Sequence, residues 1–338
     1  MSRVAIVILN YNGKNYLEQF LPTLKKYSRG HTIFVADNHS TDDSVDFLTK
    51  HHHDVEKILL SQNYGFSEGY NQALQKIEAD YYILINSDIE VTEGWIAPII
   101  ALMDQNPEIA ACQPKILSFE NKDKFEYAGA AGGFIDTLGY PFCRGRLFET
   151  IESDTGQYDD NREIFWATGA CLFVRAEAYV KAGGLDKDYF AHMEEIDLCW
   201  RLKRMGYSIF YCGNSQVYHI GGGTLHKTNS FKTYLNFRNS LVTLYKNTPF
   251  SQLLWKMPLR WILDVLAAFR FLTQWSFDNF WAIGKAHTAF LRNLLKIEAK
   301  RKKVLKLGSK TQFKEIYKGL IVVAYFLKKV RIYSHLKH

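Results

Sequence analysis

The sequence predicts an α/β fold in which a mostly parallel sheet is flanked by helices and followed by a helical extension. From residue 1 to about 110, short apolar runs alternate with helix-period segments. The runs lack the in-out alternation of half-exposed strands, so we expect strands buried on both faces. After residue 230 the chain changes to long helical stretches rich in Trp, Phe, Lys and Arg. We therefore divide it into an α/β domain, residues 1–229, and a helical extension, residues 230–338.

Four apolar runs predict the central strands, at residues 4–9, 32–36, 57–60 and 81–85, and helices begin between them near Lys14, Asp42 and Phe66. Each run ends in a polar turn. Because ligands bind where the carboxyl ends of parallel strands meet the following helices, these turns should line one crevice.

The rest of the domain is less regular. Residues 110–165 include five small residues at 129–133 and a polar stretch at 149–162, which predict a mobile flap. A strand is expected at 165–174, a helix at 193–205 ended by Gly206, and a further strand at 208–212.

Composition narrows the class of protein. Five cysteines without a CxxC pair or zinc spacing favour a reducing compartment, the cytoplasm. The first apolar run is too short for a signal peptide or a membrane span. The net charge of +7 gathers in residues 296–338, which hold 13 Lys/Arg against two acidic residues. Charges interrupt the apolar stretch 259–283, which predicts a helix lying on a surface, and residues 319–327 suit a docking or interfacial segment.

The polar turns at the first three strand ends suit a nucleotide. Asp37 follows the second strand, where a carboxylate can accept a base N–H or a sugar hydroxyl; an Asx turn explains it equally well. Asn63 precedes a helix start whose free N–H groups favour anions. No GxGxxG follows the first strand, which argues against an NAD enzyme.

Two further places carry carboxylates or imidazole. Asp88, in the turn Asn86-Ser87-Asp88, suits a hard divalent cation, although an Asx turn is an equal alternative, and His219 ends another apolar run. The expected helix at 193–205 begins with Glu194, Glu195 and Asp197. The helix dipole stabilises all three acids, but acids clustered near an anion site suggest that one is a base, and Glu195 is our candidate.

Taken together, these segments resemble family 2 of the inverting glycosyltransferases with the GT-A fold, in particular its rhamnosyltransferase-like branch. The resemblance covers about residues 3–225 and rests on seven motifs in order: VAIVILNYNG, VADNHSTDDSV, NYGFSEGYNQAL, INSDIEVTEGW, ATGACLFVRAEAY, GGLDKDYFAHMEEIDLCWRLKRMGY and VYHIGGG.

The resemblance implies a role for each matching residue. Asp37 would contact the nucleotide base, with further donor contacts from Asn10, Tyr11, Asn63 and Asn86. Asp88 would bind Mg²⁺ or Mn²⁺, with His219 as a further ligand. Glu195 stands where the family usually has an Asp base. The sugar or acceptor pocket would be bordered by Trp166, Gly169 and Glu194, although core packing explains Trp166 equally well.

The implied reaction moves a sugar from a UDP- or dTDP-sugar to an acceptor hydroxyl with inversion, in the synthesis of surface polysaccharides or lipid-linked glycans. The basic, aromatic extension fits peripheral contact with the inner face of the cell membrane; a solvated basic face is the alternative. No nucleic-acid module is recognised. Two other functions stay open: a weak or inactive glycan-binding or membrane scaffold of the same fold, and a nucleotidyltransferase.

Overall fold

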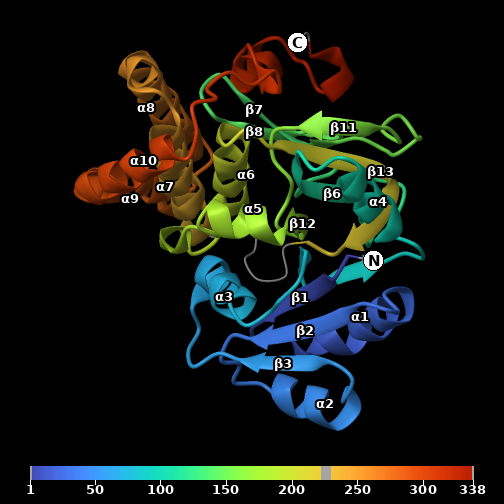
Figure 1. Cartoon of the computed structure of the whole chain (residues 1–338). Coiled ribbons are helices and arrows are strands. Elements are labelled where there is room, and N and C mark those ends of the chain that lie inside the picture. The colour runs from blue at the N-terminus through green and yellow to red at the C-terminus, as the bar shows by residue number, and fades with distance from the viewer. Residues whose placement is uncertain (1, 222–229, 337–338) are drawn as a thin grey trace.

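A computed structural model describes residues 2–221 and 230–336 (Figure 1). Nine strands form a large mixed sheet: β1 (Val4–Asn10), β2 (Thr32–Asp37), β3 (Glu56–Leu59), β4 (Tyr81–Ile85), β5 (Ile89–Val91), β6 (Ile109–Ser118), β11 (Asn161–Ile164), β12 (Cys171–Arg175) and β13 (Ser208–His219). Their order is β11-β13-β6-β12-β4-β1-β2-β3, with β5 paired to β13. The strands β3, β2, β1 and β4 are parallel, whereas β12 is antiparallel to β4 and β6.

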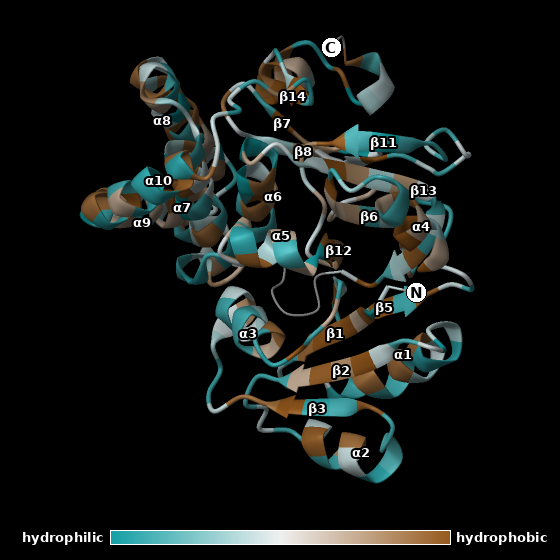
Figure 2. Cartoon of the chain, in the orientation of Figure 1, coloured by the Kyte–Doolittle hydropathy of each residue, from teal (hydrophilic) through white to brown (hydrophobic). Residues whose placement is uncertain are grey.

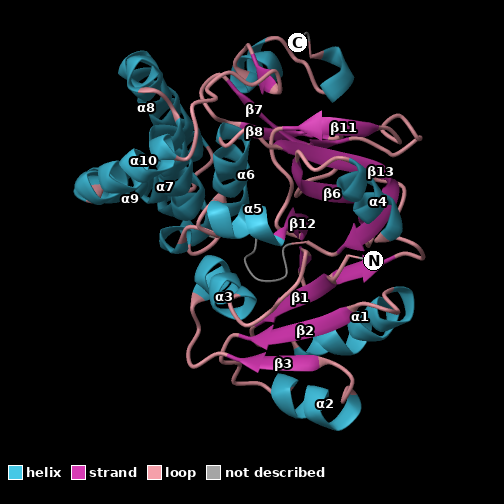
Figure 3. Cartoon of the chain, viewed as in Figure 1, coloured by secondary structure: helices cyan, strands magenta, loops and turns pink. Residues whose placement is uncertain are grey.

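Helices cover this sheet (Figure 3). They are α1 (Lys14–Tyr27), α2 (Ser44–His51), α3 (Gly65–Leu74), α4 (Ala97–Gln105), α5 (Ala176–Lys181) and α6 (Glu194–Arg204). Val7 on β1 and Leu84 on β4 belong to one core cluster, and Ile6 and Ile83 belong to the cluster on the other face. Apolar residues on both faces explain why these strands show no alternation. The predicted fold class is confirmed.

The flap expected within residues 110–165 is wrong in part, because that region contains strands. β6 spans ten residues, and a second sheet has the order β10-β9-β8-β7-β14. Ion pairs fasten the acidic stretch: the buried ammonium of Lys115 lies 2.7 Å from Asp154, and Arg144 lies 2.6 Å from Asp160. The small sheet consists of β7 (Gly133–Asp136), β8 (Pro141–Cys143), β9 (Arg146–Leu147), β10 (Thr150–Ile151) and β14 (Ile316–Tyr317).

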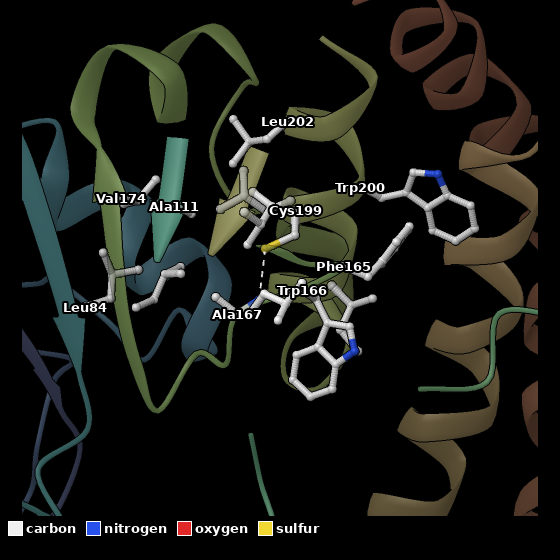
Figure 4. Close-up of a cluster of buried hydrophobic side chains, with 14 of the residues drawn as sticks. Leu84, Ala111, Phe165, Trp166, Ala167, Val174, Cys199, Trp200 and Leu202 are labelled. Atoms are coloured by element: carbon white, nitrogen blue, oxygen red, sulfur yellow. Dashed lines mark hydrogen bonds between the residues drawn. The ribbon is translucent and has the colours of Figure 1, made fainter. Parts of the chain in front are cut away.

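The strand expected at 165–174 begins only at Cys171, because the preceding residues pack under α6 instead. The backbone N–H of Ala167 donates to Sγ of Cys199 at 3.5 Å (Figure 4). Trp166 lies in the same apolar cluster, and its indole N–H donates to the carbonyl of Phe134 at 2.9 Å. All five cysteines are buried and free.

The extension begins with four helices on one side of the molecule (Figures 1 and 3). They are α7 (Ser230–Asn247), α8 (Phe250–Thr273), α9 (Phe277–Arg292) and α10 (Leu294–Lys306). The helix expected at 259–283 is divided between α8 and α9, and Trp275 at the turn has a positive φ of 57°. Beyond α10 the chain returns to the small sheet, where β14 pairs with β7 and Ile321 is buried.

Candidate active site

The ends of β1 and β2 are joined by side-chain hydrogen bonds. Asn10 pairs with Asp37 in the strand register, and its Nδ2 donates to Asp37 Oδ1 at 3.0 Å. The other carboxylate oxygen of Asp37 accepts from the backbone N–H of Ser40 at 2.9 Å. Asn10 and Asp37 are both buried, whereas Tyr11 is 46% exposed. These contacts build an Asx-type turn, and Tyr11 is an exposed aromatic side chain beside it.

The start of α3 is fixed to the same edge by asparagines. Asn38 donates to Oδ1 of Asn63 and to the carbonyl of Gly65, both at 3.0 Å. Gly65 has a φ of +72°, and a Cβ there would lie 2.7 Å from the ring of Phe190, so a side chain would be strained and would clash. The turn around Asn63 therefore touches the loop that leads into α6.

Asp88 and His219 meet because β5 and β13 pair. His219 lies opposite Ile89 in the antiparallel register, and its Nε2 is 3.1 Å from Asp88 Oδ1. On the other side of the imidazole, Nδ1 lies 3.5 Å from Oε2 of Glu126. All three side chains are buried. Burial disfavours the charged imidazole, but the two carboxylates outweigh it and raise the pKa of His219 to about 10.

Asp88 and His219 could supply some, but not all, of the ligands that a divalent cation needs. One carboxylate and one imidazole, which must lose its proton when it binds the cation, suit a site in which diphosphate oxygens and waters complete the coordination. Glu126 stands behind the imidazole, as the carboxylate partner of a metal-bound His commonly does. Within residues 2–221 and 230–336, no three His, Cys, Asp or Glu side chains are grouped as a site made of protein ligands alone would require. The residues Gly222, Gly223 and Thr224, which follow His219, lie outside the described part of the chain.

Glu195 lies in the first turn of α6 with an unsatisfied carboxyl. Its Oε2 is inaccessible and has no hydrogen-bond partner in the described structure, and the same holds for Oε2 of Glu194. Burial raises the pKa of Glu195 to about 7, and burial together with the neighbouring Glu195 raises the pKa of Glu194 further above its usual range. A carboxyl with a pKa near 7 is suited to act as a general base.

Asp197, the third acid of that turn, is occupied by structural contacts. It is fully buried and accepts from Arg201 at 2.8 Å, from Lys246 at 3.0 Å and from Asn247 at 2.9 Å. Burial opposes its ionisation, but Lys246 and Arg201 hold the pKa of Asp197 below its usual value. Because Lys246 and Asn247 belong to α7, Asp197 fastens α6 to the extension.

The loop before α6 is strained and is also held by α7. Phe190, His192 and Met193 have φ values of 66°, 69° and 74°, which cost roughly 1–3 kcal/mol each. Nδ2 of the buried Asn239 lies 3.1, 2.9 and 2.8 Å from the carbonyl oxygens of Tyr189, Ala191 and His192. The Asn239 side chain therefore offsets part of the backbone strain in the loop that positions Glu195.

The short segment of residues 169–170 lies between the Asn86–Asp88 turn and Glu195. The backbone N–H of Asn86 donates to the carbonyl of Ala170 at 2.9 Å. A Cβ built on the neighbouring Gly169 would lie 3.8 Å from Cβ of Glu195. Gly169 thus lies beside the base candidate, whereas Trp166 packs in the core, as its packing alternative expects.

The amino-acid sequence matches a known protein family over about half of its length. The family model for glycosyl transferase family 2 matches residues 5–181. The chain belongs to glycosyl transferase family 2. N-acetylglucosaminyl-diphospho-decaprenol L-rhamnosyltransferase of Mycobacterium tuberculosis is 26% identical over 78% of this chain and 90% of its own length. Rhamnosyltransferase WbbL of Escherichia coli is 24% identical over 68% of this chain and 86% of its own length.

Solved glycosyltransferases share the fold. GalNAc-T7, solved with UDP, GalNAc and Mn²⁺, superposes with a TM-score of 0.56 at 15% identity over 72% of this chain, which spans 48% of that protein. The mannosyltransferase PcManGT from Pyrobaculum calidifontis, solved with GDP-Man and Mn²⁺, gives 0.51 at 14% identity over 90% of this chain and 80% of its own. None of the helices in the described ranges has both the length and the apolarity that a membrane span requires.

Two residues of the candidate site were not found from the sequence. Glu126 stands in a polar stretch with no strand-end signal; its backbone N–H donates to the carbonyl of Ile116 on β6, and β6 pairs with β13, which carries His219. Asn239 is one of several asparagines in a helix assigned to the extension. Both residues reach the site only through contacts with residues far away in the sequence, so no local sequence pattern marks them.

Proposed function

We propose that this family 2 glycosyltransferase is an inverting, metal-dependent enzyme that transfers a sugar from a UDP- or dTDP-sugar to an acceptor hydroxyl. The observation that carries the proposal is that Ala170 accepts a hydrogen bond from the turn leading to Asp88, while the neighbouring Gly169 lies beside the base candidate Glu195. A site for a leaving diphosphate and a site for a proton therefore flank one segment.

The reaction needs one proton transfer. The acceptor oxygen attacks the anomeric carbon from the face opposite the diphosphate, a new carbon–oxygen bond forms, and the bond from that carbon to the diphosphate oxygen breaks. Glu195 takes the hydroxyl proton, and its pKa of about 7 lets it be ionised at neutral pH. Asp88 and His219 would hold Mg²⁺ or Mn²⁺, which would supply Lewis-acid stabilisation of the departing charge.

The donor turns have distinct tasks in this proposal. Asn10, Asp37 and Asn63 form a pre-organised edge for the nucleoside, and Tyr11 offers an exposed ring to it. The rhamnosyltransferase relatives, one of them named for a diphospho-decaprenol acceptor, support a lipid-linked glycan as acceptor. We place the enzyme in the cytoplasm at the inner face of the cell membrane.

The test is release of nucleoside diphosphate from a panel of UDP-, dTDP- and GDP-sugars, with Mn²⁺, Mg²⁺ or EDTA and a lipid extract as acceptor. We expect release from a UDP- or dTDP-sugar that depends on the metal and is absent in Asp88→Ala. Analysis of the product anomer checks inversion. If no donor releases nucleoside diphosphate, the proposed enzymatic activity is refuted and a glycan-binding scaffold becomes the favoured function.

A further inference from the structure

Helix α8 is amphipathic in the opposite sense to an ordinary surface helix. Three of its five buried positions are charged: Lys256, Arg260 and Asp264 are 7%, 2% and 0% exposed, and the other two are Leu253 and Ala268. The outward positions are apolar, and Ile262 and Leu266 are 57% and 59% exposed. A surface helix of a globular protein normally turns its apolar side to the core. Further outward residues of α8 are Phe250, Leu254, Trp255, Val265 and Phe269.

Buried polar contacts fix this orientation. Arg260 Nε donates to Asp264 Oδ1 at 2.9 Å, and the Tyr140 hydroxyl donates to the same oxygen at 3.0 Å. His287 of α9 lies 3.1 Å from the other oxygen of Asp264. The Arg260 guanidinium also stacks 3.6 Å from the centre of the Tyr140 ring. Rotating α8 to bury its apolar side would break the contacts of Asp264 with Tyr140 and His287 and the stacking of Arg260 on Tyr140, so these contacts favour the observed orientation.

The apolar surface continues around the end of α8 onto α9. Trp275 in the turn is 83% exposed, and Phe277 and Trp281 of α9 are 51% and 63% exposed. Figure 2 shows hydrophobic residues on both helices, which lie at an edge of the molecule far from β3. Monomeric proteins rarely leave so many large apolar side chains exposed together, and such a patch marks an interaction site.

A cationic groove adjoins this surface at Trp281. The groove has a volume of about 740 Å³. It is lined by Tyr234, Trp281, Gly284, Lys285, Thr288, Ala289, Arg292 and Asn293, among which there is no carboxylate. Across α8 and α9 the exposed cations are Arg270, Lys285 and Arg292, against one exposed carboxylate, Asp278. The apolar surface is therefore bordered by positive charge.

We propose that the outward face of α8 and the α9 groove together bind the surface of a lipid bilayer that carries anionic headgroups. The apolar residues enter the boundary between headgroups and acyl chains, tryptophans favour that same depth, and Lys285 and Arg292 contact phosphates. The proposal deepens the proposed function, because it names the surface that brings the enzyme to a lipid-linked acceptor. A second copy fits less well, since two-fold pairing on this face would bring like-charged grooves together.

The test is flotation of the full chain with vesicles of phosphatidylcholine, alone or mixed with phosphatidylglycerol. We expect the wild type to bind the mixed vesicles and added salt to weaken binding. Ile262→Glu with Leu266→Glu should reduce binding by at least about tenfold, because charged groups would enter the acyl boundary. Lys285→Gln with Arg292→Gln should weaken binding to the mixed vesicles by about 25-fold, roughly fivefold for each cation.

Val180→Glu is the matched control, because this valine of α5 is 68% exposed outside the proposed surface. It should bind like the wild type, and thermal unfolding checks that every variant is folded. The inference is overturned if the α8 variant, folded, floats like the wild type, or if Leu266→Glu instead dissociates a dimer. The vesicles contain neither donor nor acceptor, so the two proposals can fail separately. If the wild type turns over a donor but does not bind vesicles, only the membrane-binding surface is refuted. If it binds vesicles but turns over no donor, only the proposed function is refuted.

Discussion

The base candidate gives the sharpest prediction. Replacing Glu195 by Gln removes the proton acceptor but keeps the shape of the side chain. General base catalysis contributes about 10²- to 10⁴-fold to a rate, so kcat should fall by that factor while donor binding stays within about twofold. Because the neutral amide at this partly buried position loses no ion pair in the described structure, folding should be unaffected.

The pH dependence separates a base from a structural residue. Burial raises the pKa of Glu195 to about 7, so the carboxyl is mostly protonated below that pH and cannot accept a proton. The wild-type kcat/KM should rise about tenfold per pH unit on the acid side and level off above about pH 7. The assay is nucleoside diphosphate release at saturating acceptor, with donor affinity measured by calorimetry. A Glu195→Gln enzyme with the wild-type rate, or with the same ascending limb, would refute the assignment.

Four further predictions concern the neighbouring groups. Asp88→Ala should abolish turnover and the Mn²⁺-dependent part of donor affinity, measured by calorimetry with and without EDTA; unchanged metal dependence would argue against a ligand role. Glu126→Gln should weaken Mn²⁺ binding by about 10- to 100-fold, because the imidazole of His219 loses its orienting carboxylate; metal titration followed by donor binding checks this. Asn239→Ala removes contacts to three carbonyls of a strained loop, so kcat should fall at least about tenfold with unchanged donor affinity; equal losses in both would indicate general misfolding. Lys246→Met leaves Asp197 with one cation fewer in a buried site and should lower the free energy of unfolding by about 3–5 kcal/mol, measured by urea denaturation.

The central sheet could be predicted because its strands are simple in physical terms. The runs at β1 and β4 are apolar on both faces, and a polar turn ends each one. The same pattern placed Asn10 and Asp37 at one edge, and they pair there. The strands β6 and β13 were harder, because charged residues such as Lys115 interrupt the pattern and are buried only through ion pairs with distant carboxylates.

The extension was the least predictable part for a related reason. Its basic residues suggested a solvated or membrane-facing surface, but Lys246 of α7 and Lys300 of α10 both contact the partly buried Asp186. Apolar residues of α8, conversely, face outward. Composition records how many charged and apolar residues a helix has, whereas only their pairing across the fold decides which side they face.

These contacts also connect the extension to the chemistry. Three of the four non-glycine residues at 190–193 have a positive φ, which persists only where surrounding contacts over-determine it, and here Asn239 of α7 supplies such contacts. Asp197, the fourth residue of α6, is held by Lys246 and Asn247, which also belong to α7. The loop on one side of Glu195 and the helix turn on the other are thus both fastened to α7. A force or ligand that displaced α7 would move the base candidate relative to Gly169, and the position of Glu195 therefore depends on residues outside the segment that the family model covers.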